Sequence, residues 1–285
     1  MAFYNCTGLK NVTISSSVLT IAANAFTNCT SLNSIFIPSS VTDIGNGAFL
    51  NCSGSINVDP GNQKYSSLDG VLFDKQQTKL LQCPSNKTGD YYIPSSVNII
   101  GSYAFYFCSG LTSINLTYSI NTIQYFAFGY CTGITSIMIP SSVTSFEGYI
   151  FYNCSGMNSL TIQNREPLDL SNNTVAFQGL DQTTCKLVVP FGTSALYSAA
   201  KQWKDFVNIE EMPEFKLSAT TSVIPVTGGT DNINLTTGLT WTASSNKPWL
   251  AVNPSSGNGS CTIILTAQPN PTVGIRAAVV NVSAV

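Results

Sequence analysis

Ala48-Phe49-Leu50-Asn51-Cys52 is one copy of a pattern, Ala-Phe-x-x-Cys, that returns along most of the chain. Its copies begin at Ala2, Ala25, Ala48, Ala104, Ala127 and, with isoleucine in place of alanine, Ile150. The first three copies are evenly spaced, the last three have the same spacing, and the period is 23. A fixed period of this length predicts a solenoid, in which each repeat buries its apolar side only against its neighbours.

The residues before each copy predict how one turn of the solenoid is built. Ile35 and Ile37 alternate with polar or exposed positions, which is the period of a short strand with one buried face. Pro38 ends that strand, and Gly45 allows a turn into Ala48-Phe49-Leu50-Asn51-Cys52, where we expect a short helical segment. Successive strands are expected to stack into a parallel sheet about 4.8 Å apart.

The cysteines follow the repeat rather than a metal or redox motif. Six of the nine hold one position of the pattern, where a small buried thiol is expected on every turn. Cys83, Cys185 and Cys261 lie outside that ladder, and the sequence contains no Cys-x-x-Cys pair. We therefore expect no zinc, no other cofactor and no thiol redox centre.

Charge and composition exclude several classes of function. The chain has 12 basic and 14 acidic residues, so it has no basic stripe for a phosphate backbone and nucleic acid is not an expected partner. Its apolar runs fall short of the roughly 20 residues that span a bilayer. Histidine, the commonest general base, is absent, so we expect no enzyme.

The repeats resemble a known family. Ile37-Pro-Ser-Ser-Val41, Ile93-Pro-Ser-Ser-Val97 and Ile139-Pro-Ser-Ser-Val143, each followed by the Ala-Phe-x-x-Cys pattern or its variant, are similar to the BspA-type leucine-rich repeats of bacterial surface proteins. This resemblance implies an α/β leucine-rich-repeat solenoid of short parallel strands over residues 1–212.

Two irregular parts of that solenoid are expected. The step from Ala48 to Ala104 is longer than two repeats, which predicts a longer inserted turn near residues 53–92. Apolar residues at helical spacing near 193–207 predict an amphipathic helix that caps the core. Glu210-Glu211-Met212-Pro213-Glu214 is interpreted as an acidic linker.

Residues 213–285 predict a second domain. Short alternating strands, separated by turn signals every 8 to 12 residues, are typical of an immunoglobulin-like β-sandwich. Gly228-Gly229-Thr230, Trp241-Thr242 and the stretch from Trp249 to Gly257 resemble the BACON domain of Bacteroidetes surface and secreted proteins.

Candidate binding residues lie in both domains. The outward strand positions of the repeats are uncharged, and we expect them to line a concave sheet: Thr13, Phe36, Asn57, Tyr92, Asn115, Met138 and Thr161. Of these, Phe36, Tyr92 and Met138 are candidate partner contacts, because large apolar side chains on a polar face can anchor a partner. Trp241 and Trp249 are candidate glycan contacts. The competing interpretation places both in the core of the sandwich, and the alternation of Trp241 with threonines favours it.

The resemblance implies a non-enzymatic, exported adhesin that binds host or bacterial surface proteins through its repeats. The alternative is a carbohydrate-, glycoprotein- or mucin-binding protein that acts through the BACON-like domain. A hydrolase is disfavoured, and a purely structural spacer remains open. Because the sequence opens in the middle of a repeat, we expect a signal or anchor to precede it in the full-length protein.

Overall fold

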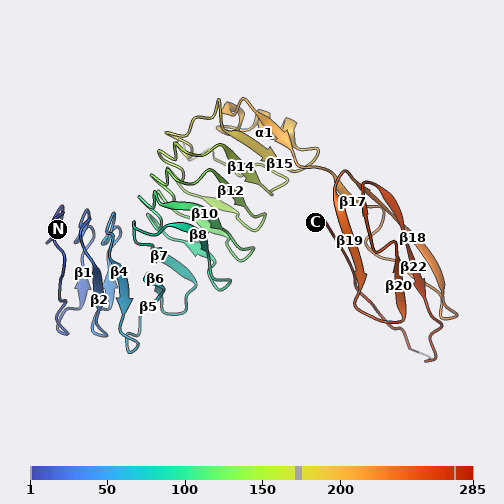
Figure 1. Cartoon of the computed structure of the whole chain (residues 1–285), viewed down its shortest axis with the longest axis horizontal. Coiled ribbons are helices and arrows are strands. Elements are labelled where there is room, and N and C mark those ends of the chain that lie inside the picture. Colours follow the sequence, from blue (N-terminus) through green and yellow to red (C-terminus); the bar gives the residue numbers. More distant parts are fainter. Residues whose placement is uncertain (1, 171–174, 273, 285) are drawn as a thin grey trace. The chain divides into compact units, whose positions relative to one another are not determined.

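The computed structural model describes residues 2–170, 175–272 and 274–284. The chain divides into two compact units, Met1–Glu211 and Met212–Val285. The first unit is a β-solenoid: in Figure 1 its first strands lie side by side near the N-terminus, and its later strands lie one above another. Helical residues of the described part are confined to α1 (Ser194–Ala199) and the 3₁₀ turn η1 (Trp203–Asp205).

Each turn of the solenoid, called a rung here, contributes one longer strand to parallel sheets. These strands are β2 (Ser34–Ile37), β4 (Ser55–Val58), β8 (Gly89–Tyr92), β10 (Leu111–Asn115), β12 (Ser136–Ile139), β14 (Ser159–Ile162), β15 (Lys186–Val189) and β16 (Ile209–Glu211). They form three sheets: β2 with β4, β8 with β10, and β12-β14-β15-β16 in that order. Equivalent residues of neighbouring rungs pair, as Ile35 does with Ile56 and Ile137 with Leu160.

A second side of each rung carries a strand of only two residues. These strands are β1 (Thr20–Ile21), β3 (Asp43–Ile44), β9 (Ile99–Ile100), β11 (Thr122–Ile123) and β13 (Ser145–Phe146). The Pro-Ser-Ser turn before them also joins the rungs. The hydroxyl of Ser40 donates to the carbonyl of Val18, and that of Ser142 donates to the carbonyl of Ile120. The turn motif therefore connects each rung to the one before it.

The third side of each rung is formed by the Ala-Phe-x-x-Cys segment. A short helix was expected there, but the segment is not helical. The residue before each cysteine adopts the left-handed conformation, with φ of 62° at Asn28 and 53° at Asn51, which interrupts a right-handed helix. Backbone hydrogen bonds run between rungs instead, for example from the N–H of Phe26 to the carbonyl of Ala48 at 2.8 Å. These segments form a ladder of stacked turns.

The cysteine ladder lies inside the solenoid. Cys29, Cys52, Cys108, Cys131 and Cys154 are at most 2% exposed. The thiol of Cys131 donates to the carbonyl of Phe105 at 3.0 Å, and that of Cys154 donates to the carbonyl of Phe128 at 3.0 Å. Burial raises the pKa of Cys52 and of Cys154 to about 12. Each cysteine is thus a neutral thiol that bonds to the previous rung.

The inserted segment is an antiparallel hairpin. Strands β5 (Tyr65–Leu68) and β6 (Val71–Asp74) pair across a turn at Asp69-Gly70, and β7 (Lys79–Gln82) continues from β6 into the short-strand sheet. The side chain of Leu72 packs in the apolar cluster of the first rungs, while Val71 and Phe73 pack in the cluster of the later rungs. Strand β6 therefore lies between the two parts of the solenoid core.

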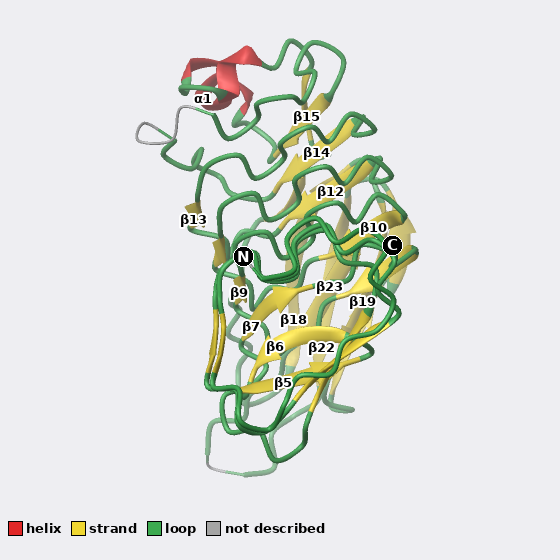
Figure 2. Ribbon diagram, turned by 90° about the vertical axis from the view of Figure 1, so that its left-hand side faces the viewer, coloured by secondary structure: helices red, strands yellow, loops and turns green. Residues whose placement is uncertain are grey.

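The last rungs differ from the sequence-based expectation. Ala176-Phe177 extends the ladder, since the ring of Phe177 stacks on that of Phe151 at 6.3 Å. The capping helix near 193–207 is shorter than predicted, because α1 ends at Ala199 and Ala200 is extended with a ψ of 142°. Gln202 follows with a φ of 66°, and its side chain bonds to the backbone of Ala176 and Leu170. Figure 2 shows α1 at one end of the solenoid.

The capping segment still closes the core with aromatic side chains. Tyr197 and Trp203 are fully buried, with their polar atoms bonded to the carbonyls of Asn164 and Leu168. Leu196 and Val207 are two of the apolar residues near 193–207 whose helical spacing predicted a buried face, and both are exposed. The apolar face of the cap is thus carried by the aromatic residues rather than by a continuous helical stripe.

The second unit is a two-sheet antiparallel β-sandwich. One sheet has the order β17 (Phe215–Leu217), β18 (Gly229–Thr237), β22 (Cys261–Ala267) and β20 (Leu250–Asn253). The other has the order β21 (Ser256–Asn258), β19 (Thr240–Ser245) and β23 (Val280–Ala284). Ile233, Leu235, Trp241 and Ile263 form the centre of its core. The fold class predicted from the sequence is confirmed for both units.

Candidate binding surfaces

The outward positions of the longer strands form the first candidate surface, called the strand row here. On these strands it consists of Phe36, Asn57, Tyr92, Asn115, Met138 and Thr161, and Thr13 holds the equivalent place in the first rung, outside any strand. Phe36 is 52% exposed, Tyr92 is 72% exposed and Met138 is 51% exposed. Strand register places each of them beside a polar neighbour on the next rung: Phe36 beside Asn57, Tyr92 beside Asn115, and Met138 beside Thr161.

The three apolar members of the strand row do not form one continuous patch. Phe36 lies on the β2-β4 sheet, Tyr92 on the β8-β10 sheet and Met138 on the sheet that begins with β12. The hairpin β5-β6-β7 follows the first of these sheets in the chain. The strand row therefore offers separate apolar anchors on a polar background.

A second outward row on the same strands was not considered from the sequence, and it is polar. Its middle carries Asp90, whose carboxylate accepts hydrogen bonds from the hydroxyls of Thr112 and Ser113, both at 2.8 Å. These bonds lower the pKa of Asp90, so the carboxylate stays charged. The carboxylate signal was present in the sequence, two residues before Tyr92, at the outward position of the same strand.

The acidic stretch interpreted as a linker is partly structural. Glu210 and Glu211 belong to β16, the last strand of the solenoid. Glu210 forms an ion pair with Lys186 at 2.9 Å. The carboxylate of Glu211 accepts hydrogen bonds from the N–H groups of Gly192 and Ser194, and bonding with these residues lowers its pKa to about 2. Both carboxylates are therefore engaged at the capped end.

The two candidate tryptophans of the second unit occupy different environments. Trp241 is 1% exposed, its Nε1–H donates to the carbonyl of Gly259 at 2.9 Å, and Gly257 lies against its ring. A sugar ring has no access to it, so its assignment as a glycan contact is not supported. Trp249 is half-buried, with the guanidinium of Arg276 4.0 Å from the centre of its ring.

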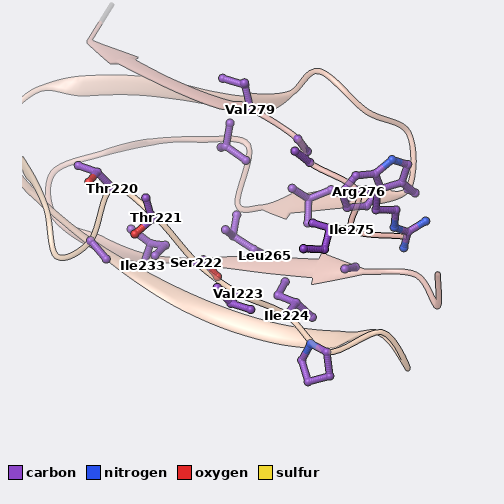
Figure 3. A pocket seen from close by; sticks show the side chains of 18 of the residues that line it. Thr220, Thr221, Ser222, Val223, Ile224, Ile233, Leu265, Ile275, Arg276 and Val279 are labelled. Atoms are coloured by element: carbon purple, nitrogen blue, oxygen red, sulfur yellow. The ribbon is translucent and has the colours of Figure 1, made fainter. Parts of the chain in front are cut away.

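Trp249 lines a cavity of about 730 Å³ between the strands of the second unit (Figure 3). Most of the wall is apolar, with Ile224, Leu265 and Ile275 among its residues. Figure 3 shows Arg276 at one end of this cavity, where it is the charged side chain of the lining. This cavity is the second candidate surface.

In residues 2–170, 175–272 and 274–284 no group of three or more acidic, cysteine or histidine side chains is arranged to hold a metal ion. Of the helices in that same part of the chain, none has the length and apolar character that a membrane crossing needs.

Comparison with protein families identifies both units. The model of the BspA type leucine rich repeat region matches residues 1–89 and 83–187, in six copies. The model of the viral BACON domain matches residues 214–285. The comparison with curated proteins gives no match.

Solved structures of bacterial proteins resemble the chain. A leucine-rich repeat protein from Eubacterium ventriosum is 28% identical with a TM-score of 0.51, and the match covers 59% of this chain and 45% of that one. The pneumococcal vaccine antigen PcpA is 23% identical with a TM-score of 0.54, and the match covers 72% of this chain and 63% of that one. The matched part thus spans less than two thirds of either protein.

Proposed function

Because this chain belongs to the BspA-type leucine-rich-repeat family, we propose that it is an exported, non-enzymatic adhesin that binds host or bacterial surface proteins through the strand row. The observation that carries the proposal is the exposure of Phe36, Tyr92 and Met138, at half or more of each side chain. Aromatic residues and methionine are enriched at protein interfaces, where a few residues carry most of the binding energy.

The polar surroundings suit such an interface. Asn57, Asn115 and Thr161 lie directly beside the three anchors, where they can hydrogen-bond to a partner's backbone at the rim. Asp90 adds one fixed negative charge, which favours a partner with a basic side chain at that point. The surface is therefore adapted to a folded protein rather than to a phosphate or nucleic acid.

A non-enzymatic role agrees with the chemistry of the carboxylates. The adjacent Glu210 and Glu211 are held by Lys186 and by the backbone of the capping segment. A pair of catalytic carboxylates would instead face each other across a space for substrate. We accordingly expect no turnover of glycan or peptide substrates.

The test uses the whole chain and four immobilised probes: mucin, deglycosylated mucin, fibronectin and fibrinogen. Biolayer interferometry is expected to show binding to a probe that persists after deglycosylation. The triple variant Phe36→Ser, Tyr92→Ser and Met138→Ser is expected to weaken this binding about tenfold or more, because it removes the apolar anchors.

A matched control removes large exposed side chains that lie outside the strand row. The variant Tyr4→Ser and Leu19→Ser is expected to bind nearly as the wild type does, since it leaves the anchors and their polar neighbours in place. Unchanged affinity of the Phe36, Tyr92 and Met138 variant for every bound probe would contradict the proposal.

The alternative function is glycan binding by the second unit, and Trp249 is the residue that supports it. Its half-buried ring lies at a cavity, and an aromatic ring beside a cavity is a site where a sugar can stack. Under this alternative, Trp249→Ala abolishes mucin binding and deglycosylation of mucin does the same. Persistence of mucin binding in that variant would exclude it.

A further inference from the structure

Three consecutive rungs carry a group of aromatic side chains on their turn segments, called the aromatic array here. All are half-buried, and they are Tyr103, Tyr106, Phe107, Phe126, Tyr130, Tyr149 and Tyr152. The array lies on the Ala-Phe-x-x-Cys side of the rungs, whereas the strand row lies on the strands. It is therefore a separate surface from that of the proposed function.

Five rings of the array form two stacked columns. In the first, the ring centres of Tyr103 and Phe126 are 5.3 Å apart, and those of Phe126 and Tyr149 are 4.5 Å apart. In the second, Phe107 and Tyr130 stack at 4.4 Å. Each column runs from rung to rung along the solenoid.

The remaining two rings, Tyr106 and Tyr152, meet both columns at steep angles. Tyr106 contacts Phe126 and Tyr130 edge to face, at 5.9 and 5.3 Å. Tyr152 contacts the same two rings edge to face, at 5.5 and 5.4 Å. Gly129 is the equivalent residue of the middle rung, and the ring of Tyr106 lies 2.7 Å from the place a side chain would take there. Tyr106 and Tyr152 are therefore two rungs apart, and glycine instead of a third tyrosine lies at the equivalent position between them.

The array is not required by the repeat. Its column residues adopt the left-handed conformation, with φ of 63° at Tyr103, 53° at Phe126 and 58° at Tyr130. In the first rungs the same positions hold asparagine, as at Asn24 and Asn28. Asparagine tolerates this conformation better than a bulky aromatic residue does. Strained residues concentrated at one place are a reason to look for a functional role.

The chemistry of the array is that of neutral phenols with a carboxylate at the edge. Burial, followed by the neighbouring phenols of Tyr130, Tyr103 and Tyr152, raises the pKa of Tyr106 to about 12. The hydroxyl group of Tyr106 is therefore a protonated hydrogen-bond donor. Glu147 accepts hydrogen bonds from the N–H of Tyr125 and from the side chain of Gln124, both at 3.1 Å, and a carboxylate has lone pairs for several donors at once.

We propose that the aromatic array binds a proline-rich segment in the polyproline II conformation, with a basic residue beside it. Rungs lie about 4.8 Å apart, so Tyr106 and Tyr152 recur after about 9.6 Å. A polyproline II helix has three residues per turn and a rise of about 3.1 Å, so it presents the same face about every 9.3 Å. A segment lying along the solenoid would place one proline over each tyrosine.

Two further features of the array match this ligand. The backbone of a polyproline II helix makes no internal hydrogen bonds, so its carbonyls can accept from the phenol hydroxyls. The carboxylate of Glu147 complements a lysine or arginine of the segment. Aromatic-lined surfaces are a general way to recognise such segments, because the ligand is already ordered before it binds.

The test measures binding of the whole chain to three probes. They are a proline decapeptide that ends in arginine, a glycine-serine peptide of equal length that ends in arginine, and cellohexaose. The proline peptide is expected to bind and the other two are not. The double variant Tyr106→Thr and Tyr152→Thr is expected to weaken that binding about tenfold or more, because it installs the residue found at Thr27 of an earlier rung.

Two variants make the result specific. Tyr4→Thr changes the equivalent residue of the first rung, outside the array, and is expected to leave binding unchanged. Glu147→Gln keeps every ring and is tested with a fourth probe, a proline decapeptide without arginine. It is expected to weaken binding of the arginine-ended proline peptide more than binding of this fourth probe.

The proposal is overturned if the proline peptide does not bind, if cellohexaose binds in its place, or if the correctly folded Tyr106 and Tyr152 variant binds as tightly as the wild type. Should that variant fail to fold, equal binding of both proline peptides by the Glu147→Gln variant and the wild type would overturn the assigned role of the carboxylate. The strand-row variant serves as a second control, since it is expected to bind the proline peptide normally.

Discussion

The turn segments of the early rungs and those of the middle rungs share their inward residues and differ in their outward ones. Asn24-Ala25-Phe26-Thr27-Asn28-Cys29 and Tyr103-Ala104-Phe105-Tyr106-Phe107-Cys108 both bury alanine, phenylalanine and cysteine. The inward rings stack at nearly the same spacing, 5.6 Å between Phe26 and Phe49 and 5.7 Å between Phe105 and Phe128. The half-buried residues of the first segment are Asn24 and Asn28, since Thr27 is buried and donates its hydroxyl to the carbonyl of Gly47, whereas those of the second are the aromatic Tyr103, Tyr106 and Phe107.

This difference shows which positions are constrained by the fold and which are available for function. A side chain inside a rung must stack on its neighbours above and below, so its size and polarity are prescribed. A side chain outside a rung meets only the outward side chains of neighbouring rungs, where hydrogen-bonded amides, as at Asn28 and Asn51, or stacked rings, as at Phe107 and Tyr130, both fit. Sequence variation between equivalent outward positions is therefore where binding is to be sought in this molecule.

The largest expected effect is at the inward ladder. Phe128 is fully buried and stacks between Phe105 and Phe151. Phe128→Ala is expected to cost about 3 to 5 kcal/mol of stability, because it leaves a cavity between two rungs. Urea unfolding followed by circular dichroism measures this cost. Tyr130→Ala, in the same segment but outward, is the matched control, and an equal cost for both variants would remove the distinction between inward and outward positions.

A smaller loss of stability is expected where a glycine lets the backbones of two rungs approach closely. A side chain at Gly156 would lie 2.0 Å from the carbonyl oxygen of Thr132 in the previous rung, so Gly156→Ala is expected to destabilise by about 1 to 3 kcal/mol. Gly8 holds the same place in the first rung, where nothing lies within 4 Å. Gly8→Ala is thus expected to change the urea midpoint little. The same shift in both variants would show that rung contact is not the cause.

The repeat predicted the inward ladder well. The constant step between copies and the six equivalent cysteines indicated a buried thiol on each rung, and five of these cysteines are at most 2% exposed. A fixed period predicts which positions are buried because equivalent residues of successive rungs meet the same neighbours. It could not show that the turn segments are non-helical, because alanine, phenylalanine and cysteine at that spacing also fit one face of a helix.

Features that break the period were predicted less well. Ala176-Phe177 continues the ladder after a longer step from Phe151. It was missed because Leu180 stands where the pattern has cysteine. The cap was interpreted as one helix because its apolar residues have helical spacing, but the helix ends at Ala199, and the left-handed Gln202 after it bonds to backbone distant in the sequence. The exposure of Phe36, Tyr92 and Met138 follows from strand alternation, whereas their roles in binding stay predictions.

The aromatic array was visible in the sequence but was not singled out. Tyr103, Phe126 and Tyr149 each precede an inward pair, and each stands one repeat after the last. A comparison of equivalent outward positions would have found them. Their contact could be expected from the rung spacing, but the left-handed backbone that holds them could not, because asparagine and not tyrosine signals that conformation.

The most direct test of the account replaces outward residues of the middle rungs with the asparagine of the early rungs. A variant with Tyr103→Asn, Phe107→Asn, Phe126→Asn and Tyr130→Asn places the asparagine of the early rungs at four outward positions of the middle rungs. Thermal unfolding followed by circular dichroism should give a cooperative transition within a few degrees of the wild type, roughly 2 to 4 °C per kcal/mol of change, because lost ring contacts and relieved backbone strain oppose each other. Loss of the cooperative transition would contradict the account, since outward residues would then be part of what makes the solenoid fold.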